Sequence, residues 1–124
     1  MIARGEARYE SKLRGVAPLL DWVDNGIRFC HFSAADKVVG AGAAYLYVLL
    51  GVAEVYAEVL SEPARWVLEQ HGIAAEFGTC VPHIQNRARD GVCPIEEAVA
   101  DATDPADALA RIRTRLAELK KGGQ

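Results

Sequence analysis

A cysteine and a glutamate stand three residues apart at the predicted start of a helix: Cys93, which precedes Pro94, and Glu96. A thiol at a helix N-terminus can have a lowered pKa and be partly thiolate near neutral pH, as a nucleophile or redox thiol requires. In that interpretation Cys93 is catalytic and Glu96 carries the proton. The alternative is a small buried cysteine, with Glu96 as an ordinary charge in the first helical turn.

A second polar group precedes the longest apolar run of the chain. Ser33 with Asp36 three residues later fits a capping-box variant, which predicts a helix from Ser33 to about Leu50. Lys37 would then lie in the first turn, where a cation opposes the helix dipole. It either pairs with Asp36 or reaches solvent, or it contacts a phosphate or carboxylate held at the helix start. Asp36 and Lys37 are therefore candidate ligand-binding residues.

The third polar point is Ser61 with Glu62, immediately before Pro63. A strand over residues 55–60 and a helix over residues 63–70 are predicted to meet there. Ser61 fits an N-cap, and proline is tolerated in the first turn of a helix. Glu62 could act as an acid or base in a pocket, although a solvated first-turn glutamate is the commoner case.

A loop-like stretch ahead of Cys93 contains Asn86 and Arg87. A guanidinium can hold a phosphate or carboxylate through two parallel hydrogen bonds, but Arg87 could equally pair with Asp90. Asn86 is a candidate hydrogen-bonding partner of the same ligand. The chain has no glycine-rich phosphate loop, since residues 40–42 fall inside a predicted helix.

Side chains that could bind a metal are present but poorly spaced. No CxxC or HxxxH pair occurs, and neighbouring residues such as Cys30 and His31 point to opposite faces of a strand. We therefore predict no metal and no other cofactor. The possible ligands are Cys30, His31, His71, Cys80, His83 and Cys93.

Strand-like and helix-like segments alternate, which predicts a single α/β domain over residues 1–124 with a partly parallel sheet. In such sheets ligands gather where strands end and helices begin. Gly40 and Gly42 are expected to let a buried helix approach a neighbouring strand closely. Strands are predicted at 1–3, 7–12, 27–32, 55–60, 73–77 and 81–84, and helices at about 18–24, 33–50, 63–70, from 94, and from 104 to the C-terminal region.

The composition excludes several classes of protein. The net charge is −3 without a basic block, so no nucleic-acid partner is expected. The apolar stretch 38–52 contains three glycines and is too short to span a bilayer, and charges interrupt the first residues, so neither a membrane span nor a signal peptide is expected. Three irregularly spaced cysteines form no disulfide framework, which favours the cytoplasm.

Four stretches together resemble a bacterial and archaeal family of unknown function with a cytidine-deaminase-like fold. They are SKLRGVAPLL at 11–20, ADKVVG at 35–40, SEPA at 61–64, and NR at 86–87 followed by DGVCPIE at 90–96. The resemblance implies a three-layer α/β/α domain with a mixed sheet and a cluster of polar residues, but no established activity. Family members carry a longer N-terminal segment, so a sheet edge here is expected to be exposed or paired with another subunit.

The segment 55–68 is also similar to the strand-to-helix joint of the cytidine and tRNA adenosine deaminases. There a Pro-Cys-x-x-Cys motif binds zinc. Pro63 keeps its place here, whereas Ala64 and Val67 stand where the two thiolates should be. No His-x-Glu or Cys-x-Glu triplet occurs between residues 34 and 44 either. The resemblance thus implies the fold and a pocket, with Ser61 and Glu62 on its floor, but not zinc-dependent deamination.

Three functions remain open from the sequence. The leading hypothesis is a pocket for a small polar, nucleotide-like ligand, in which Lys37 and Arg87 contact an anion and Asp36, Ser61 and Asn86 donate or accept hydrogen bonds. The second is a thiol-dependent enzyme using Cys93, with Glu96 or Glu62 as proton carrier. The third is a non-catalytic module that forms a homodimer through a sheet edge or the C-terminal helix. "Nucleotide-like" is an analogy from the fold, which does not fix function.

Overall fold

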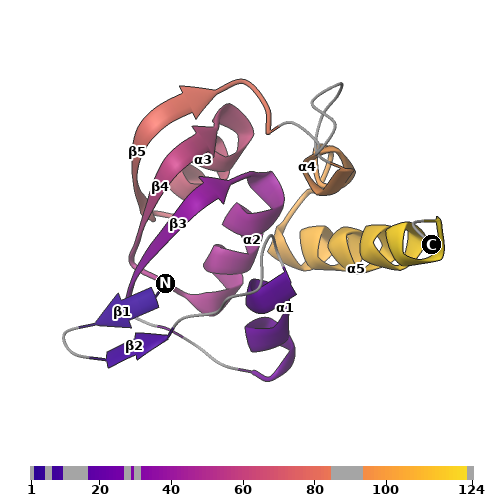
Figure 1. The fold of residues 1–124 in the computed structure, drawn as a ribbon, viewed down its shortest axis with the longest axis horizontal. Helices are drawn as coiled ribbons and strands as arrows, with labels where there is room; N and C mark the ends of the chain where they lie inside the picture. Colours follow the sequence, from indigo (N-terminus) through magenta and orange to yellow (C-terminus); the bar gives the residue numbers. More distant parts are fainter. Residues whose placement is uncertain are drawn as a thin grey trace.

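The structure is a computed structural model that describes residues 2–4, 7–9, 17–26, 29, 32–84 and 94–122. Its strands form one five-stranded sheet in the order β2-β1-β3-β4-β5 (Figure 1). The strands are β1 (Ile2–Arg4), β2 (Ala7–Tyr9), β3 (Ser33–Val39), β4 (Glu54–Ser61) and β5 (Ala74–Val81). The helices are α1 (Ala17–Asp24), α2 (Ala41–Leu50), α3 (Glu62–Gln70), α4 (Pro94–Ala98) and α5 (Pro105–Gly122).

The three long strands β3, β4 and β5 run parallel to one another. The short strand β1 is antiparallel to both β2 and β3, so the first two predicted strands, at 1–3 and 7–12, pair as a hairpin in their described residues, and the whole sheet is mixed. Helices α2 and α3 connect the parallel strands in sequence, as parallel pairing requires. The carboxyl ends of β3 and β4 therefore lie beside each other where α2 and α3 begin.

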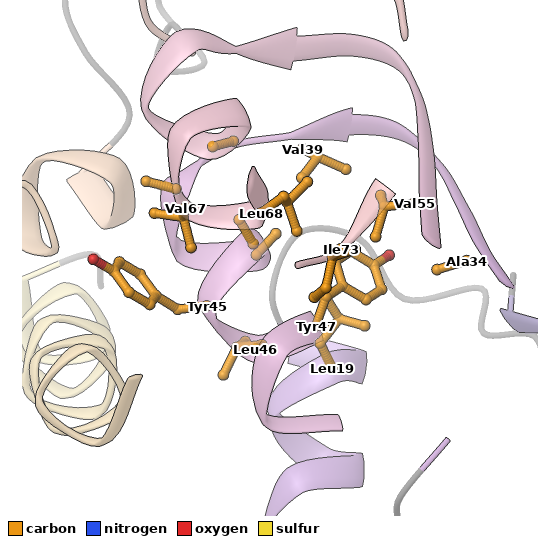
Figure 2. Packing of buried hydrophobic residues seen from close by; sticks show 14 of the residues in the cluster. Leu19, Ala34, Val39, Tyr45, Leu46, Tyr47, Val55, Val67, Leu68 and Ile73 are labelled. Atoms are coloured by element: carbon orange, nitrogen blue, oxygen red, sulfur yellow. The ribbon is translucent and has the colours of Figure 1, made fainter. Parts of the chain in front are cut away.

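Helix α2 is the centre of the molecule. Eight of its ten residues are buried, as expected for a helix that is apolar on nearly every side. It contacts β3 and all four other helices. Gly51 ends it in the left-handed conformation, with φ of 78°, and donates to the carbonyls of Tyr47 and Val48. Figure 2 shows Leu46 and Tyr47 of α2 among the buried side chains of the core, which also include Val39 of β3 and Val55 of β4.

The predicted start of this helix at Ser33 is wrong. Residues 33–39 form β3, and the helix begins only after Gly40, which has an extended backbone and no side-chain cap. Only Val38 and Val39 favour a strand by residue type, so the pairing with β4 outweighs both the residue preferences and the local capping pattern. The Ser33 hydroxyl donates to the carboxylate of Glu54 across the ladder instead of capping a helix.

The predicted strand over residues 27–32 is not confirmed in the part of it that the structure describes. Phe29 and Phe32 lie outside any strand. Phe29 is buried and packs edge-on against Trp22 and Phe32, so these aromatic rings fill the core beside α1. Their apolar character reflects core packing without strand pairing.

Most other predicted elements agree with the structure. Ser61 caps α3, and Gly72 follows that helix with φ of 71°. Asp104 accepts a hydrogen bond from the backbone N–H of Asp107 at 2.7 Å and so opens α5. Helix α5 turns Ala108 and Ile112 into the core. The two strands predicted at 73–77 and 81–84 are instead the single strand β5.

The described helices lie on one side of the sheet (Figure 1). On β4 the buried residues Val55 and Ala57 alternate with the exposed residues Glu54, Tyr56 and Glu58. Helices α4 and α5 pack onto α2 and lie farther from the strands. Within the described residues, the second helix layer of the expected α/β/α sandwich is therefore absent, and the other face of the sheet is open.

The regular alternation of strand residues shifts by one position in the middle of the sheet. The ladders on both sides of β4 omit the row of Lys37, Glu58 and Gly78. The Asp36 carboxylate accepts from the backbone N–H of Lys37 at 2.8 Å. Before this row the odd-numbered residues Val55 and Ala57 of β4 are buried, and beyond it the even-numbered Leu60 is buried. The side chains that face the helices are thus shifted by one residue at the ends of the strands.

The two glycines near the start of α2 permit close packing, but against α4 and not against a strand as predicted. A Cβ atom on Gly42 would lie 2.5 Å from Cγ2 of Ile95. Helix α4 is thus seated directly on the first turn of α2. This contact fixes the position of the segment that carries Glu96.

Replacing Gly42 by alanine should lower the free energy of unfolding by about 1 kcal/mol, since overpacking costs about 2 kcal/mol and alanine favours the helix by about 1 kcal/mol. Urea unfolding measures the change. Ile95→Ala removes the opposing methyl group, so in that background Gly42→Ala should become neutral or stabilising. Equal effects of Gly42→Ala in both backgrounds would contradict the predicted contact.

Candidate functional site

Two polar residues are fully or almost fully buried among the described residues, and they contact each other. Ser61 is 0% exposed and Glu96 4% exposed. The Ser61 hydroxyl donates to Oε2 of Glu96 at 2.6 Å. Ser61 is the last residue of β4 and the N-cap of α3, whereas Glu96 lies on α4, 35 residues later. The fold thus brings together two of the residues that the sequence nominated.

Two backbone groups complete the surroundings of the Glu96 carboxylate. The N–H of Ala41, at the start of α2, donates to Oε2 at 2.7 Å, and the N–H of Ile84, after β5, donates to Oε1 at 2.7 Å. The Ser61 oxygen also accepts from the N–H of Ala64 at 3.1 Å, which directs the hydroxyl proton toward Glu96. We call these three donors, Ala41 N–H, Ser61 O–H and Ile84 N–H, the carboxylate cradle.

The cradle lies where ligands bind in open α/β sheets, at the carboxyl ends of parallel strands. Its donors follow β3, end β4 and follow β5. The N-termini of α2 and α3 both favour a negative charge at this place, through their free N–H groups and their dipoles. In this structure the favoured anion is the carboxylate of the chain's own Glu96.

Gly40 makes this arrangement sterically possible. A Cβ atom there would lie 2.7 Å from Oε2 of Glu96 and 3.1 Å from Cγ1 of Ile84. Its φ of −97° is accessible to any residue, so the need for glycine comes from the space and not from the backbone angle. The glycine of ADKVVG and the glutamate of DGVCPIE are therefore two halves of one contact.

His83 lies at the solvent side of the cradle. Its Nδ1 is 3.9 Å from Oε1 of Glu96, and its side chain is 59% exposed. That distance exceeds a hydrogen bond, so the imidazole is a neighbour of the carboxylate and does not position it. From the sequence, His83 was a candidate metal ligand only, and no motif indicated that it lies near Glu96.

Asp36 and Lys37 are not at a helix start, so the predicted opposition of Lys37 to a helix dipole is wrong. Both lie in β3. Asp36 accepts from the Tyr47 hydroxyl at 3.2 Å. Tyr47 lies six residues beyond Ala41, about 9 Å along α2, so this contact is separate from the cradle. Lys37 is exposed and forms no ion pair with another described residue.

The other nominated residues are less informative. Glu62 is exposed in the first turn of α3, which agrees with a solvated helix-start charge. Asn86, Arg87 and Cys93 lie outside the described residues. The possible metal ligands Cys30 and His31 lie outside them as well.

The residue types at both strand-to-helix joints offer no soft metal ligand. Gly40 and Ala41 form the first joint, and Ser61, Glu62 and Pro63 form the second. In the described part of the chain, no group of three or more His, Cys, Asp and Glu side chains is arranged to hold a metal ion.

A groove of about 400 Å³ lies between α4 and α5, apart from the cradle. Arg111 and Arg115 line it together with Glu97 and Glu118, and Glu96 does not. Arg111 pairs with Asp107 at 3.1 Å. Because carboxylates offset its cations, this groove does not select an anion as the cradle does.

The Tyr47 phenol is the titratable group whose environment is most perturbed among those described. Burial, followed by the neighbouring Asp36 carboxylate, raises its pKa well above the ordinary value of 10.0. Burial together with Asp104 and Asp107 also raises the pKa of Tyr45. Both phenols therefore stay protonated in the native state under conditions in which the unfolded chain ionises.

The raised pKa of Tyr47 predicts a loss of stability in alkali. Above about pH 10 the unfolded chain binds fewer protons than the native protein, so the free energy of unfolding should fall by about 1.4 kcal/mol per pH unit for this residue. Tyr47→Phe should cost about 1 kcal/mol at neutral pH through the lost hydrogen bond, but should reduce the alkaline slope. Unfolding curves between pH 8 and about 11 test this. Parallel slopes for the wild type and Tyr47→Phe would contradict it.

Residues 1–116 match a family model that is named TM1506 and described as "Domain of unknown function (DUF1893)". The chain belongs to the DUF1893 family. A DUF1893 family protein from Thermotoga maritima, TM1506, has a crystal structure at 2.70 Å resolution that is similar to the present one. The TM-score is 0.78 at 25% sequence identity, over 94% of this chain and 78% of that chain. No curated protein is significantly similar to the chain.

Membership of DUF1893 confirms one part of the resemblance seen in the sequence, namely that the chain belongs to a family of unknown function. The matched range contains Gly40, Ser61 and Glu96, so the cradle and its carboxylate lie within the family domain. The family description assigns no activity. None of the helices in the described segments has both the length and the apolar character needed to cross a bilayer.

Proposed function

We propose that this DUF1893 domain binds a small polar ligand at the carboxyl ends of its parallel strands, beside the cradle, without zinc-dependent deamination. The observation that carries the proposal is the burial of Ser61 and Glu96 together at this place. Burying a polar pair is costly unless its hydrogen bonds are satisfied, and this chain satisfies them with groups from three separate connections. Such convergence of polar groups where strands end is typical of a ligand site.

The deaminase-like character of the domain belongs to the same proposal. The strand-to-helix joint at Ser61 supports it, since β4 runs directly into α3 with Pro63 in the first turn. Ala64 and Val67, at the positions of the deaminase thiolates, are buried in the apolar core at 0% and 2% exposure. These side chains cannot ligate zinc, so the resemblance supports a pocket and argues against metal-activated water.

The ligand is expected to approach from the side of His83, which is the exposed neighbour of the cradle. Asn86 and Arg87 follow Ile84 closely in the chain, and Lys37 precedes Gly40 by three residues. Arg87 and Lys37 would supply anion contacts, and Asn86 a hydrogen bond. A nucleotide-like ligand remains an analogy from the fold.

A thiol-dependent reaction at Cys93 has weaker support. Both oxygens of Glu96 accept short hydrogen bonds from the cradle, which suits a positioning role better than proton transfer. Glu62, the other candidate proton carrier, is exposed on α3. A thiol titration that gave Cys93 an unusually high reactivity at neutral pH would reverse this preference.

Thermal unfolding in the presence of nucleosides, nucleotides, sugar phosphates and divalent metals tests the proposal. A ligand at a hundredfold excess over its dissociation constant stabilises the folded state by about 2.7 kcal/mol. One ligand class should raise the unfolding midpoint, and Arg87→Ala, Lys37→Ala and His83→Ala should reduce the shift. Arg113→Ala, on the exposed side of α5, is the control.

Two results would contradict the proposed function. A shift caused by zinc alone would mean that a metal site exists after all. The absence of a shift with every compound would favour a non-catalytic interaction module.

A further inference from the structure

The open face of the parallel sheet is a feature that the proposed function leaves unused except for Lys37. We define it by Lys37, Val38, Glu54, Tyr56, Glu58 and Glu76. Val38 is 46% exposed and Tyr56 44% exposed. In the parallel register Tyr56 lies directly beside Glu76, and Glu54 and Glu58 flank it along β4. The exposed Lys37 stands in the row of Glu58, between Tyr56 and Val38. The apolar side chains of this face are thus flanked by three carboxylates and one cation.

Sheets of parallel strands normally have both faces covered. Here the described helices cover one face, and the open face presents large apolar side chains to solvent (Figure 1). An apolar centre with a charged rim is the usual composition of a protein interface. The open face is therefore suited to a partner that supplies the missing layer.

Gly78 leaves space for the Tyr56 ring on this face, because it has no side chain. A Cβ atom on Gly78 would lie 3.0 Å from the carbonyl oxygen of Glu58 and 3.8 Å from the Tyr56 hydroxyl. The Tyr56 ring therefore reaches across β5 over a residue without a side chain. This leaves a flat apolar surface on which a helix can lie.

The charges decide which partner fits. A second copy related by a two-fold axis would place the same patch on both sides of the contact, so two net-negative surfaces, each with three carboxylates and one lysine, would meet. Like charges in an interface oppose association. We propose instead that the open face binds an amphipathic helix of a partner protein, with an apolar stripe over Val38 and Tyr56 and flanking lysines or arginines paired with Glu54, Glu58 and Glu76.

Two synthetic peptides provide the probe. Both carry the same leucine stripe at helical spacing, with lysines beside the stripe in one and glutamates in the other. Binding of the labelled peptides to the full chain is followed by fluorescence anisotropy. The proposal expects binding of the lysine peptide, much weaker binding of the glutamate peptide, and perturbation of the Val38 and Tyr56 signals in NMR spectra.

A matched pair of triple variants separates this face from the general acidity of the chain. The face variant is Glu54→Gln, Glu58→Gln and Glu76→Gln. The control variant, with the same change in net charge, is Glu97→Gln, Asp101→Asn and Glu118→Gln, all exposed on the helix side. The lysine peptide should bind the face variant at least about tenfold more weakly, but should bind the control variant as it binds the wild type.

Three outcomes would overturn the inference. The first is equal loss of binding in the two triple variants, which would indicate non-specific charge attraction. The second is no binding of the lysine peptide to the wild type. The third is a dimer in light scattering that Tyr56→Ser dissociates, because a second copy would then cover the face.

Discussion

Glu96→Ala is expected to lower the free energy of unfolding by at least about 3 kcal/mol, because three donors lose their acceptor, two of them buried, and a buried donor without its acceptor costs about 1–3 kcal/mol. The donors are the N–H groups of Ala41 and Ile84 and the hydroxyl of Ser61. Glu96→Gln should have a smaller effect, since the amide oxygen replaces one acceptor while the amide nitrogen faces a donor. Urea unfolding followed by tryptophan fluorescence measures both changes.

The neighbouring residue supplies the control. Glu97 is exposed on the same short helix, so Glu97→Ala should change the stability by less than about 0.5 kcal/mol. Formate should restore part of the stability of Glu96→Ala by occupying the empty cradle, and should not affect the wild type. Equal stabilities of Glu96→Ala and Glu97→Ala would show that the cradle does not hold the carboxylate.

Gly40→Ala is expected to destabilise the protein by about 2 kcal/mol, because the added methyl group overlaps the bound carboxylate and must displace it. The displacement would break the hydrogen bonds of Glu96 to Ala41 and Ser61, while the backbone angle of residue 40 costs nothing. Denaturant unfolding again gives the magnitude.

A double-mutant cycle makes this second expectation specific. In the Glu96→Ala background the carboxylate is gone, so Gly40→Ala should cost much less than it does alone. The coupling energy between the two positions should reach at least about 1 kcal/mol. Strict additivity would mean that residue 40 acts through Ile84 or through the backbone, and not through Glu96.

The structure separates the predicted site residues into two groups. Ser61 and Glu96 form its buried part, whereas Asp36 and Tyr47 form a separate hydrogen bond farther along α2. Glu96 was nominated as the partner of a thiol, and its contacts instead make it a fixed anion at two helix N-termini. The ligand-binding roles of Lys37, Asn86 and Arg87 remain proposals for the binding screen.

Local interactions explain why much of the fold follows from the sequence. Caps and turns involve residues three or four positions apart, so Ser61 before Pro63, Gly72 after α3 and Asp104 before α5 act wherever the chain goes. The all-apolar character of the α2 segment likewise specifies a buried helix. These signals predicted α3 and α5 correctly.

The boundary between β3 and α2 was decided by the tertiary structure. Ser33 and Asp36 fit a helix cap as well as a strand, and only pairing with β4 and β1 selects the strand. Strand formation depends on partners distant in the chain, and a single segment does not identify them. The glycines behave likewise, since the sequence showed that they permit close approach but not that α4 is the neighbour.

The sequence by itself determined the family, the α/β class, the helix caps and the types of residue available for chemistry. The tertiary structure decided that Glu96 reaches Ser61, Ala41 and Ile84 across 35, 55 and 12 residues, and that the helices of the described residues cover only one face of the sheet. The physical reason is range: capping and periodicity act within a few residues, whereas a buried hydrogen bond or a covered face depends on how distant segments pack.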